Sequence, residues 1–217
     1  MALWDISPRL TPDLAVWPGD TPLSREVLCD MARGDNLTLS TLRATVHLGA
    51  HADAPSHYGA GGAPIDEVPL EPYLGPCQVI EVGIPAGGTV PPAAVVPRLA
   101  APRVLLRTGS FPDPRRFNDD FVALAPELVD ALADRGVTLV GVDTPSVDPF
   151  SSKELPAHRR LLARGMAVLE GLVLADVPEG VHELIALPLR LAGFDASPVR
   201  AVLRSFGTGI SRSSRSP

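Results

Sequence analysis

Proline and glycine are the residues that most restrict the fold of this chain. The 217 residues include 24 prolines and 19 glycines. Proline cannot donate a main-chain hydrogen bond, and both residues disfavour helix interiors. The chain is therefore expected to fold as many short helices and strands joined by turns. Its length predicts one domain with a substantial core, over residues 1–206.

The clearest helix is predicted at residues 125–135, where Pro126 suits the first turn and Gly136 the C-terminal stop. A second helix is predicted from Pro156 to Gly165. Apolar patterns predict strands at residues 37–48, 76–82, 104–106, 137–142 and 166–174, and within 182–189 and 199–204. Residues 207–217 are rich in Ser, Gly and Arg and are expected to be disordered. The pattern predicts an α/β domain with a mixed sheet and few helices.

Charge and hydropathy exclude several classes of protein. The net charge is −6 and there is no long basic run, so nucleic acid is not expected as a partner. No apolar stretch reaches the length of a membrane span, and no signal peptide pattern is visible. Cys29 and Cys77 are expected as free thiols, with a disulfide as the alternative. These features favour a cytoplasmic protein without membrane partners.

Three of the five histidines lie in one short stretch, as His47, His51 and His57, together with Asp53. These residues occupy odd-numbered positions, and apolar residues lie between them at positions 46, 48, 50, 52 and 54. In an extended chain this two-residue period puts the four side chains on one side, where they suit a divalent metal such as zinc. A helix would also align His47 with His51, but the glycine and proline of the stretch disfavour it. The plain alternative is a polar surface on an edge strand.

His158 and Glu170 are the candidate ligands outside this stretch. His158 falls early in the second predicted helix, and Glu170 interrupts the apolar run of the strand that follows. A carboxylate in a buried strand is costly unless it is paired or bound to a metal. A helix, a glycine stop and a returning strand would bring the two side chains together.

Several other polar and aromatic residues allow two interpretations. Trp17, in a turn-rich segment, packs on the core or forms one wall of an aryl-binding pocket. Asp143, Ser146 and Asp148 follow a predicted buried strand and belong either to a site or to a turn. His182 has no such companions and is expected to be structural or exposed. No phosphate-binding loop and no G-x-S-x-G motif is present, so a serine hydrolase has no support.

Taken together, these residues resemble the cyclase-like metal-dependent hydrolases, whose signature is close to H-x-G-T-H-x-D-x-P-x-H. Within that family the similarity is greatest to the bacterial kynurenine formamidases (arylformamidases). The resemblance runs from about residue 5 to residue 204, and Ala50 stands where many members have Thr. The matching segments are residues 17–22, 47–58, 62–65, 73–77 and 141–146, with His158 and Glu170.

The resemblance implies a swivelling β/β/α domain that forms a homodimer, with a site for two divalent metal ions, zinc or alternatively manganese. His47, His51 and Asp53 would bind one ion. His158 would bind the second ion, with Asp53 and Glu170 shared by both. The implied roles of the two remaining site residues are the acid/base for His57 and substrate contact for Trp17.

The implied activity is hydrolysis of N-formyl-L-kynurenine to L-kynurenine and formate, a step of tryptophan degradation, by a hydroxide held at the metals. The small-molecule partner would be an aryl formamide. Two alternatives remain open at this point. One is a hydrolase of the same family that acts on another aryl amide or on a lactam such as isatin. The other is a non-catalytic metal-binding protein.

Overall fold

The computed structural model describes residues 1–206, so the predicted disordered tail at 207–217 lies outside the described residues. The described part contains a nine-stranded mixed sheet, in agreement with the predicted α/β class. From one edge to the other, the strands are β1 (Leu3–Asp5), β13 (Val202–Arg204), β11 (Gly180–Ile185), β5 (Leu74–Glu81), β7 (Arg103–Arg107), β9 (Leu139–Val142), β10 (Ala167–Glu170), β4 (His51–Asp53) and β12 (Ala196–Pro198).

The centre of the sheet is parallel and both margins are antiparallel. Strands β5, β7, β9 and β10 pair in parallel. On one side β11, β13 and β1 continue the sheet antiparallel, and on the other side β4 and β12 do so. The central strands are almost continuously apolar because both faces of a parallel sheet are covered.

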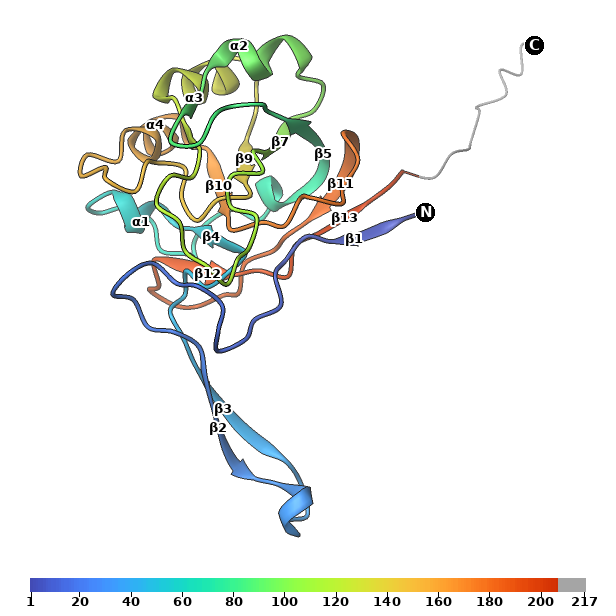
Figure 1. Ribbon diagram of the computed structural model, residues 1–217. Coiled ribbons are helices and arrows are strands. Elements are labelled where there is room, and N and C mark those ends of the chain that lie inside the picture. Colours follow the sequence, from blue (N-terminus) through green and yellow to red (C-terminus); the bar gives the residue numbers. More distant parts are fainter. Residues whose placement is uncertain (207–217) are drawn as a thin grey trace.

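Two apolar cores lie against the two faces of this sheet. One core joins Val140 and Val168 of the sheet to Leu128 and Leu161 of the helices. Figure 1 shows the helices α2 (Pro92–Val95), α3 (Pro126–Ala133) and α4 (Pro156–Arg164) gathered on that side. The other core contains Leu139 and Leu169 from the same strands, whose side chains alternate between the faces.

Short elements complete the described chain, as expected from its prolines and glycines. They are the helix α1 (Pro55–Tyr58), the paired strands β6 (Thr89–Val90) and β8 (Ala123–Leu124), and the 3₁₀ turns at Met31–Arg33, Glu71–Tyr73 and Val96–Arg98. No helix within residues 1–206 is long and apolar enough to cross a membrane. The two cysteines are free, with Cys77 buried.

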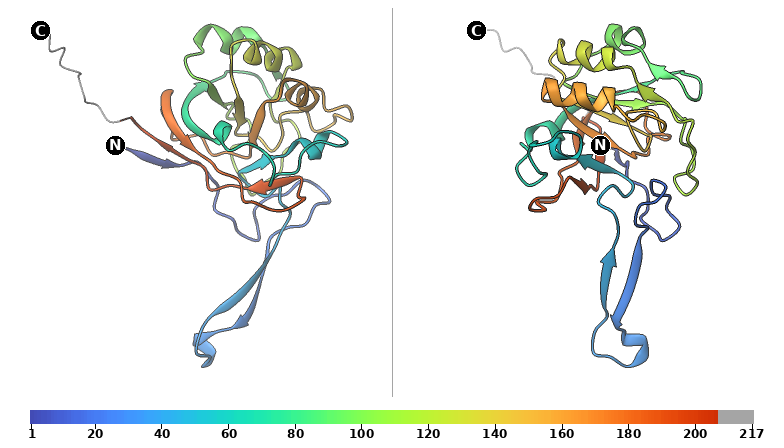
Figure 2. Two further views of the ribbon diagram at one scale, coloured as in Figure 1. Left: turned by 180° about the vertical axis from the view of Figure 1, so that it is seen from behind. Right: turned by 90° about the vertical axis from the view of Figure 1, so that its left-hand side faces the viewer.

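A hairpin of β2 (Ser24–Cys29) and β3 (Leu39–Arg43) projects away from the rest of the chain, as Figures 1 and 2 show. The predicted strand at residues 37–48 is therefore wrong in its second half, because β3 ends at Arg43 and the chain turns and bends over residues 46–50. The hairpin itself was not predicted. Every residue of β3 is exposed, so the alternation of apolar and polar residues there does not mark a buried face.

Both predicted helices are confirmed. Helix α3 has Pro126 in its first turn, and α4 begins at Pro156 and ends with Gly165 as its C-cap. The predicted strands at 76–82, 104–106 and 137–142 correspond to β5, β7 and β9, whose bounds differ by a few residues. The strand predicted at 166–174 ends earlier, at Glu170, where the chain turns. Strand β12 was missed.

Candidate metal centre

The candidate ligands meet where β10 and β4 pair, at the carboxyl end of the parallel strands. Glu170 is the last residue of β10 and lies opposite His51, and Val168 lies opposite Asp53. Because His51 and Asp53 are two residues apart on β4, their side chains share a face. His158 reaches the same place from the first half of α4. Polar side chains at this end of a parallel sheet are typical of ligand sites in α/β proteins.

Two glycines allow the chain to pass closely enough for this meeting. Gly49 and Gly171 both have positive φ, at 61° and 65°. A Cβ added to Gly171 would lie 2.2 Å from the carbonyl oxygen of Gly49. Any side chain at position 171 would therefore push the end of β10 away from the turn that precedes β4. The close approach keeps Glu170 beside His51.

The spacing of the donor atoms fits metal ligands. Asp53 Oδ1 lies 3.0 Å from His47 Nδ1 and 3.3 Å from His51 Nε2. The other carboxylate oxygen, Asp53 Oδ2, lies 3.4 Å from His158 Nε2. Glu170 is 3.4 Å from His51 Nε2 through Oε2 and 3.3 Å from His158 Nε2 through Oε1. Donor atoms about 2.1 Å from a tetrahedral zinc ion lie roughly 3.4 Å apart.

These atoms also lack other partners. Both carboxylate oxygens of Asp53 and the Nε2 of His158 are buried and have no hydrogen-bond partner among the described residues. Leaving buried polar atoms unpaired is costly, so their convergence needs a ligand. Two groups of donors arise, one with His47, His51 and Asp53 and the other with Asp53, His158 and Glu170. Asp53 belongs to both, so the residues fit a pair of divalent cations.

The Nδ1 atom of each buried imidazole, which faces away from the donor cluster, has a hydrogen-bond partner. His51 Nδ1 lies 2.8 Å from the carbonyl oxygen of Gly49, which can only accept a hydrogen bond, so Nδ1 is the donor. His158 Nδ1 lies 2.7 Å from Asp148 Oδ2. The proton on Nδ1 leaves the Nε2 lone pair of each ring facing the donor cluster. Such outer contacts orient metal-binding histidines in many proteins.

Asp148 has a second role at the start of α4. Its two carboxylate oxygens accept hydrogen bonds from the backbone N–H groups of Ala157 (2.9 Å) and His158 (3.0 Å). The same carboxylate thus caps the helix and orients the His158 ring. Glu170 is fixed similarly, because its Oε1 accepts a hydrogen bond from the backbone N–H of Val147 at 2.8 Å.

The buried groups strongly change one another's proton affinity. Burial lowers the pKa of His51, but the carboxylates of Asp53 and Glu170 outweigh burial and raise it to about 10. Burial also opposes protonation of His158, yet Asp148 and the same two carboxylates raise its pKa well above the ordinary value. The surrounding imidazoles hold the pKa of Asp53 well below its usual range despite burial. The donor cluster therefore strongly favours positive charge at its centre.

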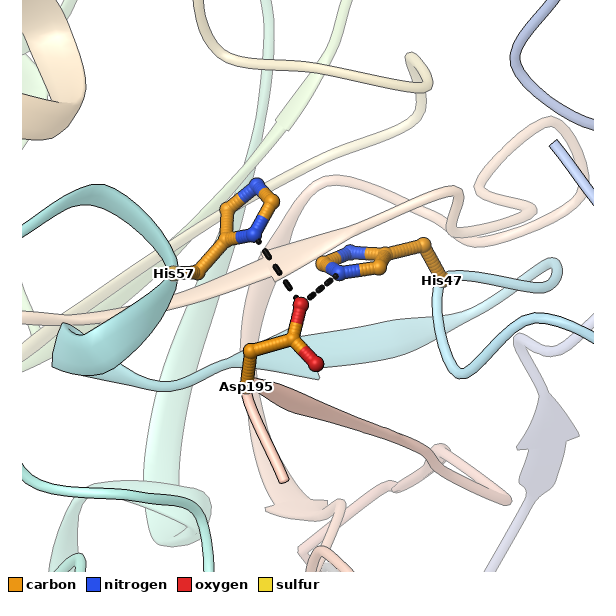
Figure 3. Close-up of side chains that lie close together, drawn as sticks. All are labelled: His47, His57 and Asp195. Carbon is orange, nitrogen blue, oxygen red and sulfur yellow. Dashed lines mark hydrogen bonds and ion pairs between the residues drawn. The ribbon is translucent and has the colours of Figure 1, made fainter. Parts of the chain in front are cut away.

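A second, more open group of side chains adjoins the buried cluster. Asp195 Oδ2 lies 3.0 Å from His47 Nε2 and 3.3 Å from His57 Nδ1, as Figure 3 shows. The side chain of His57 is 34% exposed and that of Asp195 47%. Burial works to raise the pKa of Asp195, but the two imidazoles outweigh it and lower the pKa. This group can exchange protons with a molecule bound in front of it.

The expected one-sided strand does not account for the histidine cluster. His47 lies in a turn, His51 and Asp53 lie on β4, and His57 lies on α1. Four of the five even-numbered residues are buried, since Leu48, Ala50, Ala52 and Ala54 are at most 2% exposed, whereas Val46 is half-buried. The period therefore marked the buried residues correctly but not one continuous extended segment. Proline at position 55 begins a helix there because its fixed φ suits the first turn.

A cavity of about 640 Å³ opens in front of the donor cluster. Its lining includes His47, His51, His57, His158 and Glu170 at one end. Aromatic and proline side chains form the walls, namely Trp17, Phe111, Phe117, Pro18, Pro112, Pro114 and Pro145. This volume and apolar lining are typical of a site for a small organic molecule.

Trp17 both packs against neighbouring side chains and forms part of the cavity wall. The ring packs against Phe117 and Phe150, with centroid distances of 5.5 and 5.0 Å. It also lines the cavity and is 37% exposed. The neighbouring aromatic rings hold the indole in place, so that one part of it is available for contact with a ring in the cavity.

The remaining sequence candidates divide between structure and site. Asp143 accepts hydrogen bonds from the backbone N–H groups of Thr108 and Gly109 and so fixes a loop at the cavity wall. Ser146 also lines the cavity. His182 is buried with its Nε2 2.9 Å from the carbonyl oxygen of Pro178, away from the donor cluster. Its role is structural, one of the two outcomes that were expected.

Sequence reasoning missed Asp195 and the function of Asp148. Asp195 is 138 residues from His57 in the chain and lies in a segment of small and apolar residues without any ligand pattern. Only the pairing of β12 with β4 brings it to the site. Asp148 had no local signal either, because it lies eight residues before Pro156, the first residue of α4, whereas the N-cap position is Leu155.

Comparison with known proteins places this chain in a family. The model of the Cyclase family matches residues 4–149. A solved structure described as a potential metal-dependent hydrolase with cyclase activity is 27% identical, with a TM-score of 0.81 over 93% of this chain and 96% of that one. A second, described as a predicted metal-dependent hydrolase from Bacillus stearothermophilus, is also 27% identical, with a TM-score of 0.79 over 93% and 97% of the two chains.

Isatin hydrolase A from Labrenzia aggregata shares the fold at 23% identity, with a TM-score of 0.77 over 95% of this chain and 94% of that one. The likeness in fold extends over nearly the whole described chain, and the family match spans more than half of the sequence. The chain belongs to the Cyclase family, and its fold is that of cyclase-like metal-dependent hydrolases.

Proposed function

We propose that this protein is a metal-dependent hydrolase of aryl amides and that N-formyl-L-kynurenine is its substrate, with L-kynurenine and formate as products. The observation that carries the proposal is the position of the donor cluster at one end of an aromatic-walled cavity. A reactive centre and a place for an aromatic ring therefore adjoin one another. Relatives described as metal-dependent hydrolases support the reaction class.

The residues that would hold two divalent ions, zinc in the first instance, are those of the two donor groups. His47, His51 and Asp53 form one set, and His158 and Glu170 join Asp53 in the other. Glu170 Oε2 also lies 3.4 Å from His51 Nε2, so Glu170 would be shared by both ions, like Asp53. When bound, such ions polarise a carbonyl group and lower the pKa of water, so that a nucleophile is available at neutral pH. The protein contributes fixed donor geometry, and its cavity walls exclude bulk water from the substrate.

His57 is the proposed acid/base. It borders the cavity, is part exposed, and has Nδ1 directed at Asp195, which leaves Nε2 for the substrate side. During hydrolysis it would take a proton from the attacking water and deliver it to the departing aniline nitrogen. Its neighbours on β4 are buried ligand candidates, whereas its own place on α1 leaves the ring room to accept and release a proton.

Trp17 is the proposed contact for the aryl ring. The indole forms part of the cavity wall and is held by the surrounding phenylalanines. Three charged side chains outside the donor cluster, Asp20, Arg107 and Asp143, also line the cavity. Arg107 already contacts Glu81 and the carbonyl oxygen of Val177, and Asp143 accepts backbone hydrogen bonds, which leaves Asp20 as the partner for a substrate ammonium group. A substrate with a charged amino-acid end needs charged partners of this kind, which favours N-formyl-L-kynurenine over a neutral ring compound.

Isatin is the second candidate substrate, because proteins described as isatin hydrolases share this fold. The same donors and the same acid/base would serve to open its lactam ring. The two candidates differ in charge, so Asp20→Asn is expected to raise KM for N-formyl-L-kynurenine several-fold and to leave hydrolysis of isatin unchanged. Equal effects on both substrates would remove the argument from charge.

The test of the proposed function is a comparison of turnover on N-formyl-L-kynurenine and on isatin, with elemental analysis of the same purified sample. We expect zinc near two equivalents per chain and faster release of L-kynurenine than of the isatin product. Faster turnover of isatin would reverse the order of the two substrates. A metal-loaded protein inert towards both compounds would favour a non-catalytic metal-binding protein.

A homodimer is the assembly we propose. Leu28, Leu39 and Leu42 of the projecting hairpin are half or more exposed. An isolated two-stranded hairpin is only marginally stable in water, so a second copy of the chain is the proposed cover for these side chains. Light scattering should give the mass of a dimer, and Leu42→Glu should shift it towards a monomer. A monomeric unmodified protein would contradict this assembly.

A further inference from the structure

We propose that Asp195 is a positioning residue that fixes the orientation and the proton of two histidines together, His57 as the acid/base and His47 as a metal ligand. The proposal rests on the proposed function for the roles of those two rings. It goes beyond that function by assigning a role to a residue from the far end of the chain.

The geometry has one carboxylate oxygen as its centre. Asp195 Oδ2 lies 3.0 Å from His47 Nε2 and 3.3 Å from His57 Nδ1, and Figure 3 shows both contacts reaching the same oxygen. The two imidazole centroids are 4.3 Å apart. A carboxylate oxygen accepts hydrogen bonds and can serve two N–H donors at once. Each ring therefore carries a proton on the nitrogen that faces Asp195.

That arrangement determines what the other nitrogen of each ring can do. With its proton on Nε2, His47 directs the Nδ1 lone pair at the donor cluster, where Nδ1 is 3.0 Å from Asp53 Oδ1. With its proton on Nδ1, His57 has an Nε2 lone pair free to accept a proton from a reactant. The carboxylate also stabilises the imidazolium that forms when His57 takes that proton, as aspartate does in a catalytic triad.

The backbone explains why Asp195 is held in this place. Asp195 immediately precedes β12, whose Ala196 pairs with Asp53 of β4. Its own carbonyl oxygen accepts a hydrogen bond from the backbone N–H of Ala54 at 2.9 Å. His57 follows three residues after Ala54, on α1. The strand pair that carries the metal ligand Asp53 thus also sets the distance between Asp195 and His57.

A third cation bound by His47, His57 and Asp195 is the competing explanation, since their donor atoms lie within 4.8 Å of one another. Hydrogen bonding explains the group better, because its polar atoms are part exposed and already paired, unlike the buried, unpaired atoms of the donor cluster in the described chain. His47 would also have to bind cations through both ring nitrogens. Three equivalents of zinc in the unmodified protein, falling to two in Asp195→Asn, would overturn the positioning role.

The decisive variant is Asp195→Asn, which keeps the shape of the side chain but removes its charge and offers an N–H donor. The control is Asp66→Asn, which changes a carboxylate that accepts a hydrogen bond from Gly193 in the same loop and touches neither histidine. At saturating zinc, kcat of Asp195→Asn should fall by about 10²-fold or more with KM nearly unchanged. Asp66→Asn should retain the unmodified rate.

A spectroscopic measurement separates positioning from a general structural role. In ¹⁵N spectra of zinc-loaded protein with labelled histidine, neutral His57 should carry its proton on Nδ1. Asp195→Asn should shift that proton towards Nε2, and Asp195→Glu should restore the Nδ1–H form in part. Unchanged kcat together with an unchanged His57 tautomer in Asp195→Asn would overturn the proposal.

The two proposals can fail separately. If the unmodified protein hydrolyses neither the formamide nor isatin, the proposed function fails. The tautomer comparison between the unmodified protein and Asp195→Asn still decides whether Asp195 positions His57. If the unmodified protein is active and the spectra of the two proteins are the same, only the positioning role fails.

Discussion

The two halves of the site differ in how far they are open to water, although they share neighbouring strands. In the buried half, His51, His158 and Glu170 are each 3% exposed and Asp53 1%. In the open half, the side chains of His57 and Asp195 are 34% and 47% exposed. Charges without access to water must be balanced permanently, which suits cations held in place. Groups with access to water can change protonation during a reaction, which suits an acid/base.

The largest expected effect comes from Asp53→Ala in the buried half. Asp53 belongs to both donor groups, so its removal should lose metal and all measurable turnover. Elemental analysis after dialysis measures the first effect and a kynurenine-release assay the second. Two equivalents of metal retained by this variant would contradict the shared role of Asp53.

His57→Ala tests the open half, where we expect turnover to be lost while metal is retained. Metal content should stay at that of the unmodified protein, whereas kcat should fall by roughly 10²–10⁴-fold because proton transfer is lost. The pair of variants thus separates holding the cations from moving the proton. If His57→Ala loses metal to the same extent as Asp53→Ala, the division of the site into two halves is wrong.

The buried half should also show itself in the pH dependence of metal binding. Because the pKa of His51 is raised to about 10, its ring carries a proton on both nitrogens at pH 8 when no metal is bound, and the carboxylates shift the pKa of His158 in the same direction. Zinc must displace the proton on His51 Nε2, so binding at pH 8 should release about one proton or more and strengthen by about tenfold or more per pH unit below that pKa. Calorimetry in buffers of different ionisation enthalpy measures the release. Ordinary histidines would release almost none at pH 8.

Asp148→Asn tests the support of the buried half with a smaller change. The carboxylate holds His158 Nδ1 and caps α4, so the variant should lower zinc affinity by about 10–100-fold. With zinc in excess, kcat should recover most of its value because no reacting group is altered. A competition titration with a zinc chelator measures the affinity. An affinity equal to that of the unmodified protein would show that the outer contact does not tune the site.

Trp17→Leu should have the smallest effect, because it changes the cavity wall and neither half of the centre. Loss of the indole face should raise KM for N-formyl-L-kynurenine by about tenfold, as expected for a lost aromatic contact of roughly 1 kcal/mol or more. Metal content and the kcat of an unhindered small formamide should not change. Steady-state kinetics on both substrates provide the measurement.

The sequence predicted those parts of the fold that depend on local signals. Pro156, Gly165 and the apolar run after it predicted α4 and the following strand, and so brought His158 and Glu170 together. The buried even-numbered residues between the histidines were also visible as a pattern. These predictions work because proline, glycine and apolar periodicity act on the chain within a few residues.

Features that depend on pairing between distant segments could not be predicted in this way. Asp195 reaches the site only through the pairing of β12 with β4, for which its own segment gives no signal. The turn at Gly49 depends on its contact with Gly171 at the end of another strand. The alternating residues 41–48 overlap the end of β3, but the exposure of β3 shows that this pattern alone does not distinguish a buried strand from a projecting one.

The most direct test of the account is anomalous diffraction at the zinc edge from crystals of the protein loaded with zinc. The account predicts two peaks, one bound by His47 and His51 and the other by His158, with Asp53 and Glu170 shared by both. The absence of a peak at Asp53 would contradict the account. Peaks only at surface residues, with the Asp53 carboxylate hydrogen-bonded to protonated histidines, would contradict it equally.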